Sequence, residues 1–217
     1  MTEQNSWKSL RQNAPLLSYS LLFQSPGERD IMADILSLGL EFDFILSQAS
    51  EPMLALIRLK WWEEQIAAGQ SSGVELLGRI NRHIAKGAIR GDDINRLIIC
   101  WQDYAEAGNS PDQTGQKCWA EITALCGKIA QLPETPLFYQ IGSALYNSRN
   151  GRNIGAIATA REIQDSYKKR AEFLIILAYL AQRGGDQTMP NDHLILFKIL
   201  WQVVVKPSAW PLRHLQK

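Results

Sequence analysis

Three acidic side chains form a row in the first long helical segment of the chain. Asp30, Asp34 and Glu41 are spaced at i, i+4 and i+11, which places them within about 40° of one another on a helix. Carboxylate oxygens are the ligands that Mg²⁺ prefers, so the row is a candidate metal site. The alternative is a solvated helix edge, because the helix macrodipole favours acidic residues near a helix N-terminus.

Arg58 is the second candidate for chemistry, because it falls inside an apolar helical stripe. The stripe consists of Leu54, Ile57 and Trp61. A charged side chain on a core face needs a partner, and Glu51 and Glu41 are the candidates. One interpretation is an ion pair that ties two helices together. The other is that Arg58 faces a cavity and binds an anion such as a diphosphate, for which the guanidinium fork is suited.

The remaining reactive side chains give weaker signals. Trp61 and the adjacent Trp62 point about 100° apart on a helix, so one of them enters the core while the other meets a neighbouring helix or a cavity. The three cysteines contain no CxxC pair and the three histidines are isolated, which predicts reduced thiols and no zinc site. The basic residues from Arg149 to Arg170 are interpreted as a solvated helix face.

These residues must be positioned by helices, and the prolines mark where the helices begin and end. Each of the nine prolines falls where an apolar helical pattern starts or stops, as expected for an all-α protein. Ser25-Pro26 is the clearest start, with Ser25 as N-cap and Glu28 three residues later. The helices expected from periodicity span 26–47, 50–69, 74–86, 92–107, 112–131, 137–148, 154–182 and 190–205. We therefore predict an all-α, single-domain helical bundle over 1–217, with 1–24 as a loosely packed N-terminal arm.

Composition excludes several classes of protein. The 217 residues carry 23 Lys and Arg against 22 Asp and Glu, a net charge of +1. No global field therefore attracts nucleic acid or an anionic membrane. The sequence has neither a signal-peptide pattern nor an apolar run long enough to cross a bilayer. We expect a cytoplasmic protein without nucleic-acid partners, with peripheral membrane association as a further possibility.

One segment resembles a known family. Residues 36–67 contain Glu41, then Ser50-Glu51-Pro52, then Ile57-Arg58-Leu59-Lys60-Trp61-Trp62. This order is similar to that of the squalene/phytoene synthase family, and specifically to the divergent branch related to a mitochondrial complex I assembly factor. The resemblance implies an isoprenoid-synthase-like fold with a central cavity, to which Glu41, Arg58 and Trp62 would contribute. Active members join two prenyl diphosphates head to head in isoprenoid biosynthesis, using two DxxxD boxes and Mg²⁺.

The sequence departs from the family pattern where catalysis depends on it. The first box position reads Glu41-x-x-x-Ile45, so its second acid is missing, and no second box follows. We therefore assign no catalytic residue and expect a protein that has lost prenyl transfer and acts in binding or assembly, with respiratory-complex biogenesis as one such role. Its expected partners are a prenyl diphosphate or other apolar ligand, or a protein at the membrane surface. The alternative is a Mg-dependent prenyltransferase that uses the acidic row.

Overall fold

The structure is a computed structural model that describes residues 6–107, 111–133 and 136–150. Over these ranges the chain forms helices and no strand, which confirms the all-α class. The helices expected over 154–182 and 190–205 lie outside the described residues.

Eight helices occupy the described part of the chain. They are α1 (Ser6–Asn13), α2 (Pro15–Tyr19), α3 (Pro26–Gln48), α4 (Pro52–Ala67), α5 (Glu75–Ala85), α6 (Gly91–Glu106), α7 (Pro111–Ile129) and α8 (Pro136–Arg149). Five of them begin at a proline, whose fixed φ suits the first turn and whose missing N–H is not needed there. The starts of α3, α4, α7 and α8 lie within two residues of the expected ones, whereas the short helix α2 was not expected.

The N-terminus of α3 has the predicted cap. The Ser25 Oγ accepts a hydrogen bond from the backbone N–H of Glu28 and also donates to the Glu28 carboxylate at 2.8 Å. This arrangement satisfies one of the free N–H groups of the first turn. The cap fixes where α3 begins, and so sets which of its side chains face the core.

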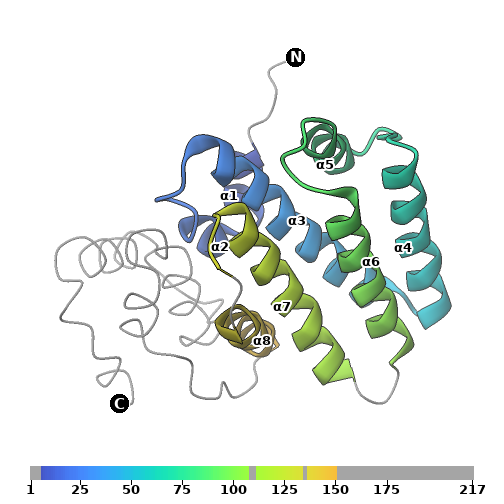
Figure 1. Cartoon of the computed structure of the whole chain (residues 1–217). Helices are drawn as coiled ribbons and strands as arrows, with labels where there is room; N and C mark the ends of the chain where they lie inside the picture. The colour runs from blue at the N-terminus through green and yellow to red at the C-terminus, as the bar shows by residue number, and fades with distance from the viewer. Residues whose placement is uncertain (1–5, 108–110, 134–135, 151–217) are drawn as a thin grey trace, which may run out of the picture.

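Helix α3 lies at the centre of the described fold. It contacts α1, α4, α5 and α7, while α6 packs between α4 and α7. In Figure 1, α4, α6 and α7 run roughly side by side, and α8, seen nearly end-on, packs against α7 on the side away from α6. The core between these layers holds the largest fully buried side chains, among them Trp101, Trp119, Phe42 and Phe138.

Helix α4 faces the core with a different stripe from the one that the sequence predicted. Ala55, Leu59 and Trp62 are buried, whereas Leu54 and Ile57 are 45% and 59% exposed. The prediction was wrong because α4 is apolar around most of its circumference, so periodicity alone does not distinguish its two faces. The inward face is the one that meets α3 and α6.

The N-terminal residues pack more tightly than the loose arm that the sequence predicted. Leu10, Leu17 and Leu21 are buried in the main core. Trp7 places its ring between the guanidinium groups of Arg11 and Arg29, at 5.4 and 4.9 Å, and donates from Nε1 to the Ser18 carbonyl at 3.0 Å. Residues 6–24 are therefore part of the folded core.

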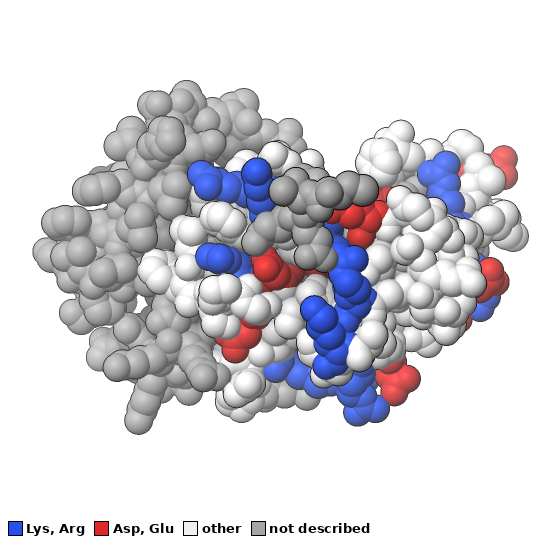
Figure 2. All heavy atoms as spheres, turned by 90° about the horizontal axis from the view of Figure 1, so that it is seen from above, with Lys and Arg blue, Asp and Glu red and all other residues white. Residues whose placement is uncertain are grey.

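The charged surface agrees with the near-neutral composition. On the face shown in Figure 2, basic side chains form a short band across the middle and acidic side chains lie beside it. Neither basic nor acidic side chains predominate on the described part of this face. Among the described helices, none is both long enough and apolar enough to traverse a bilayer.

Candidate functional site

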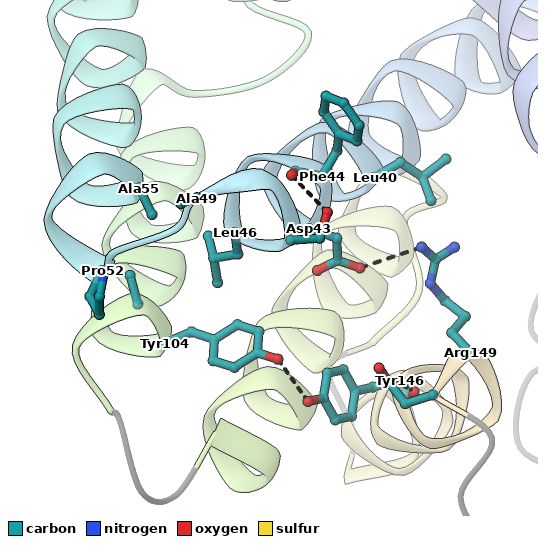
Figure 3. Close-up of a pocket in the computed structure, with 13 residues that line it drawn as sticks. Leu40, Asp43, Phe44, Leu46, Ala49, Pro52, Ala55, Tyr104, Tyr146 and Arg149 are labelled. Atoms are coloured by element: carbon teal, nitrogen blue, oxygen red, sulfur yellow. Dashed lines mark hydrogen bonds and ion pairs between the residues drawn. The ribbon is translucent and has the colours of Figure 1, made fainter.

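A pocket of about 660 Å³ opens between α3, α4, α6 and α8. Its volume lies within the range of small-molecule sites. In Figure 3, one side of the pocket is apolar, and the other carries a carboxylate, a guanidinium and a phenol, with the apolar side chains of Leu40 and Phe44 next to them. The apolar side comprises Leu46, Ala49, Pro52 and Ala55, and Asp43, Arg149, Tyr146 and the hydroxyl of Tyr104 form the polar end. The pocket is therefore suited to an apolar molecule with one polar end.

Asp43 of α3 is the centre of the polar end. Its Oδ1 accepts the indole N–H of Trp101 at 3.2 Å, and its Oδ2 accepts that of Trp119 at 2.9 Å. Nη2 of Arg149 lies 3.5 Å from the same Oδ2. These contacts bring α3, α6, α7 and α8 together at one carboxylate. A buried indole needs an acceptor, and Asp43 supplies one to two of them.

Arg149 is held in place from two sides. Its guanidinium lies 4.8 Å from the ring centroid of Trp119, in cation–π geometry, while it faces the Asp43 carboxylate. Its side chain is 35% exposed and that of Asp43 is 22% exposed. The pair therefore lies at the boundary between the core and the pocket, with both members reachable from the pocket.

Burial shifts the pKa of each member of this pair in the direction that favours its neutral form. Burial raises the pKa of Asp43, and the positive charge of Arg149 and the two indole N–H groups partly offset that rise. Burial also lowers the pKa of Arg149, which the Asp43 carboxylate opposes. Each charge is thus stabilised mainly by its partner, since water is partly excluded.

Two tyrosines complete the polar end. The hydroxyls of Tyr104 on α6 and Tyr146 on α8 are 2.8 Å apart and point toward one another (Figure 3). Burial, followed by the hydrogen bond to Tyr146, raises the pKa of Tyr104. Tyr104 is therefore a neutral phenol at physiological pH.

Sequence reasoning did not identify this site. Asp43 was overlooked beside the apolar residue Phe42, and Arg149 was interpreted as part of a solvated basic face. A usable signal existed, because Trp101 and Trp119 lie on apolar helix faces and their N–H groups need acceptors. What the sequence could not show is that both indoles meet the same carboxylate, since Asp43 is 58 and 76 residues away from them.

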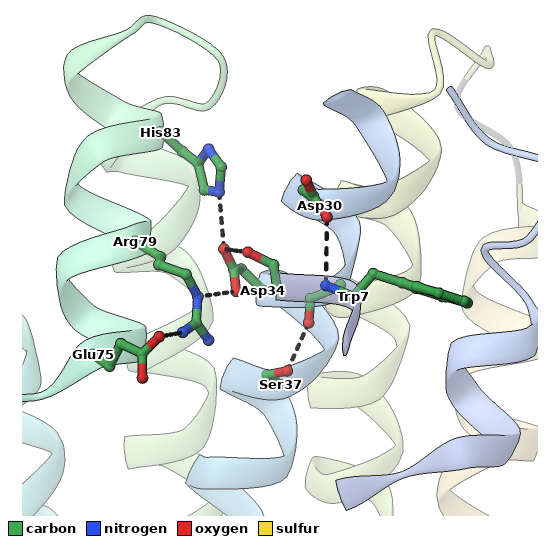
Figure 4. A network of polar contacts seen from close by, with 9 residues as sticks. Trp7, Asp30, Asp34, Ser37, Glu75, Arg79 and His83 are labelled. Carbon is green, nitrogen blue, oxygen red and sulfur yellow. Dashed lines mark hydrogen bonds and ion pairs between the residues drawn. The ribbon is translucent and has the colours of Figure 1, made fainter. Parts of the chain in front are cut away.

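The predicted acidic row does not come together as a site. Asp34 is fully buried, and Figure 4 shows its carboxylate among three donors from other helices. The Ser6 hydroxyl donates to Oδ2 at 2.8 Å, Arg79 Nε donates to Oδ1 at 2.7 Å, and His83 Nε2 lies 2.9 Å from Oδ2. Asp34 therefore joins α3 to α1 through a hydrogen bond and to α5 through an ion pair.

The other two acids of the row lie apart from this pair. Asp30 accepts the backbone N–H of Trp7 at 3.4 Å, and Glu41 is half-buried, with a pKa raised by burial. Among the described residues, no three His, Cys, Asp or Glu side chains are grouped as metal ligands. In this structure the Asp34 carboxylate is engaged by Arg79, and the three acids of the row do not converge on one point.

The residues expected to face a cavity also lie elsewhere. Arg58 is exposed on α4, about 100° around the helix from the buried Leu59. Trp62 is a core residue whose ring meets that of Phe42 at 5.6 Å in T-shaped geometry. Neither of them, nor Glu41, lines the pocket around Asp43. The expectation that Arg58 lies on a core face was wrong.

The three cysteines fit the prediction of reduced thiols. Cys100, Cys118 and Cys126 are buried and none forms a disulfide. The Cys118 thiol donates to the carbonyl of Cys100 at 3.0 Å, and burial raises its pKa. Burial also raises the pKa of Cys126, so the thiols of Cys118 and Cys126 are poor nucleophiles.

Comparison of the chain with family models, with curated proteins and with solved structures gave no match.

Proposed function

We propose that this chain is a non-catalytic, ligand-binding relative of the squalene/phytoene synthases, with an isoprenoid-synthase-like arrangement of helices. It holds an apolar ligand in the pocket between α3, α4, α6 and α8. The observation that carries the proposal is the division of this pocket into an apolar wall and a polar end. Binding sites for apolar ligands combine such walls with a few fixed polar groups.

The chemistry of the pocket supports binding rather than prenyl transfer. Magnesium-dependent transfer needs carboxylates that clamp metal ions on the substrate phosphates. Among the described lining residues, Asp43 is the only acid, and it already accepts two indole N–H groups and faces Arg149. Asp34 is engaged by Arg79 outside this pocket.

A displacement experiment tests the binding function. The full chain is titrated with N-phenyl-1-naphthylamine, a neutral probe that fluoresces in apolar sites, and the probe is then displaced with farnesol. We expect saturable binding in the wild type and a loss of about tenfold or more in affinity for Leu46→Trp, which fills part of the pocket. Ile57→Trp is the matched control, because Ile57 lies on the exposed face of α4, outside this pocket.

The same preparation tests for catalysis. Incubated with Mg²⁺ and farnesyl or geranylgeranyl diphosphate, it should give no coupled product. Formation of presqualene diphosphate, squalene or phytoene would instead establish the alternative, a Mg-dependent head-to-head prenyltransferase.

The resemblance also supports a role in the assembly of a respiratory complex, and that role rests on the resemblance alone. Deletion of the gene should then reduce NADH-linked respiration. Normal respiration in the deletion strain would remove this proposal and leave the binding function unaffected.

A further inference from the structure

We infer that the pocket selects an apolar ligand with an uncharged hydroxyl head over the diphosphate ester of the same chain. This inference rests on the proposed binding function. It names the ligand class that the polar end recognises.

The first step is the charge of the pocket. Among its described lining residues, Asp43 and Arg149 are the only charged ones, and they face each other with Nη2 and Oδ2 3.5 Å apart. Their formal charges cancel, so the polar end offers no net positive field. A diphosphate carries at least two negative charges, and its binding normally requires uncompensated cations or backbone donors.

The second step is that the Asp43 carboxylate cannot turn away from an incoming anion. Two indole N–H groups hold its two oxygens, and both Trp101 and Trp119 are fully buried. A phosphate that reached Arg149 would therefore lie beside a fixed carboxylate and would have to weaken the Asp43–Arg149 pair. Like charges at such a distance repel, and more strongly near a protein surface than in bulk water.

The third step is that a hydroxyl meets suitable partners at the same place. The carboxylate of Asp43 accepts hydrogen bonds, and the phenols of Tyr104 and Tyr146 lie on the same pocket wall. A hydroxyl both donates and accepts, and its desolvation costs far less than that of an anion. The chain of the ligand would then lie along Leu46, Ala49 and Ala55.

The test compares farnesol with farnesyl diphosphate in direct binding to the full chain, in buffer with EDTA. The wild type should bind farnesol at least about tenfold more tightly, which corresponds to about 1.4 kcal/mol. Asp43→Asn removes the negative charge and leaves Arg149 uncompensated, so it should improve binding of the diphosphate by about tenfold. Its affinity for farnesol should change by less than about threefold, because an amide still accepts a hydrogen bond.

Arg149→Met is the second variant, and its effect is opposite in sign. It leaves an uncompensated carboxylate, so binding of the diphosphate should become undetectable while farnesol still binds. This variant keeps the test decisive if Asp43→Asn fails to fold, which near-UV circular dichroism of the tryptophans would show.

The outcomes separate this inference from the proposed function. A wild type that prefers the diphosphate, with Arg149→Met abolishing that preference, overturns the selection for an uncharged head but keeps the binding pocket. Failure of both ligands to bind, or equal binding by Leu46→Trp, overturns the proposed function itself and the inference with it.

Discussion

Nε of Arg79 donates to Oδ1 of Asp34 at 2.7 Å, and both side chains are withdrawn from solvent. Nη1 of Arg79 also donates to Glu75 at 2.8 Å, so the guanidinium joins a buried carboxylate to an exposed one (Figure 4). A buried ion pair contributes little net stability, whereas removing one member leaves the other charge without a partner. The acid that resembled a metal ligand in the sequence therefore has a structural role.

Asp34→Ala should lower the free energy of unfolding by about 3–5 kcal/mol, because it removes the buried partner of Arg79 and leaves that guanidinium with the exposed Glu75 alone. Asp30→Ala is the matched control from the same row. It loses a single long contact with a backbone N–H, so we expect a loss below about 1 kcal/mol. Urea denaturation measures both values. Similar small losses in both variants, together with stabilisation of the wild type by Mg²⁺, would instead support the metal row.

Helix boundaries could be predicted because their signals are local. Ser25, Pro26 and Glu28 act within one turn, and proline limits the backbone of its own residue and of the preceding one. The inward stripe of α3 was also predictable, since Ile35, Leu38 and Phe42 recur at helical spacing and are buried.

The polar sites could not be predicted, because they depend on which helices meet. Asp34 contacts Arg79 from 45 residues away, and Asp43 contacts Trp119 from 76 residues away. Nothing in the local sequence separates these two acids from Asp30 or Glu41. The face of α4 was misassigned for a related reason, because tertiary packing alone decides between two apolar stripes.

A pair of alanine substitutions in α4 tests the assignment of its faces. Leu59 is fully buried, so Leu59→Ala should cost about 2–5 kcal/mol through lost burial and the cavity that remains. Leu54 is 45% exposed, so Leu54→Ala should cost less than about 1 kcal/mol. Chemical denaturation of the two variants measures the difference. A larger loss of stability for Leu54→Ala than for Leu59→Ala would instead support the inward stripe predicted from the sequence.

The dependence of stability on pH should report the raised pKa of Asp43. Its ordinary value is 3.8, and burial raises it in the folded protein despite Arg149 and the two indoles. Between the two values the folded state holds more protons than the unfolded state, so this group lowers the free energy of unfolding as pH rises. Asp43→Asn removes that contribution.

The stability of Asp43→Asn relative to the wild type should therefore improve as pH is raised from about 4 through the weakly acidic range. Urea denaturation of both proteins at several pH values measures this difference, whatever the fixed effect of the substitution on the contacts with Trp101 and Trp119. A difference that does not change with pH, or that moves against the variant, contradicts a raised pKa for Asp43.

The close approach of α7 and α8 depends on Gly142. A Cβ atom at this position would lie 2.4 Å from both the Ala120 Cα and the Trp119 carbonyl oxygen. These are backbone atoms, so no side-chain movement relieves the clash. Gly142→Ala should separate the two helices and lower the free energy of unfolding by about 1–3 kcal/mol or more. Because Trp119 and Arg149 lie on these helices, it should also weaken binding in the pocket.

Gly27→Ala is the matched control for this substitution. Gly27 lies in the first turn of α3, where an added Cβ meets no atom within 4 Å. Alanine there reduces the freedom of the unfolded chain and should raise stability by about 0.4–1 kcal/mol. Thermal denaturation of the two variants gives opposite signs if the helices meet as described. A Gly142→Ala variant as stable as the wild type would show that α7 and α8 pack less closely than this structure has them.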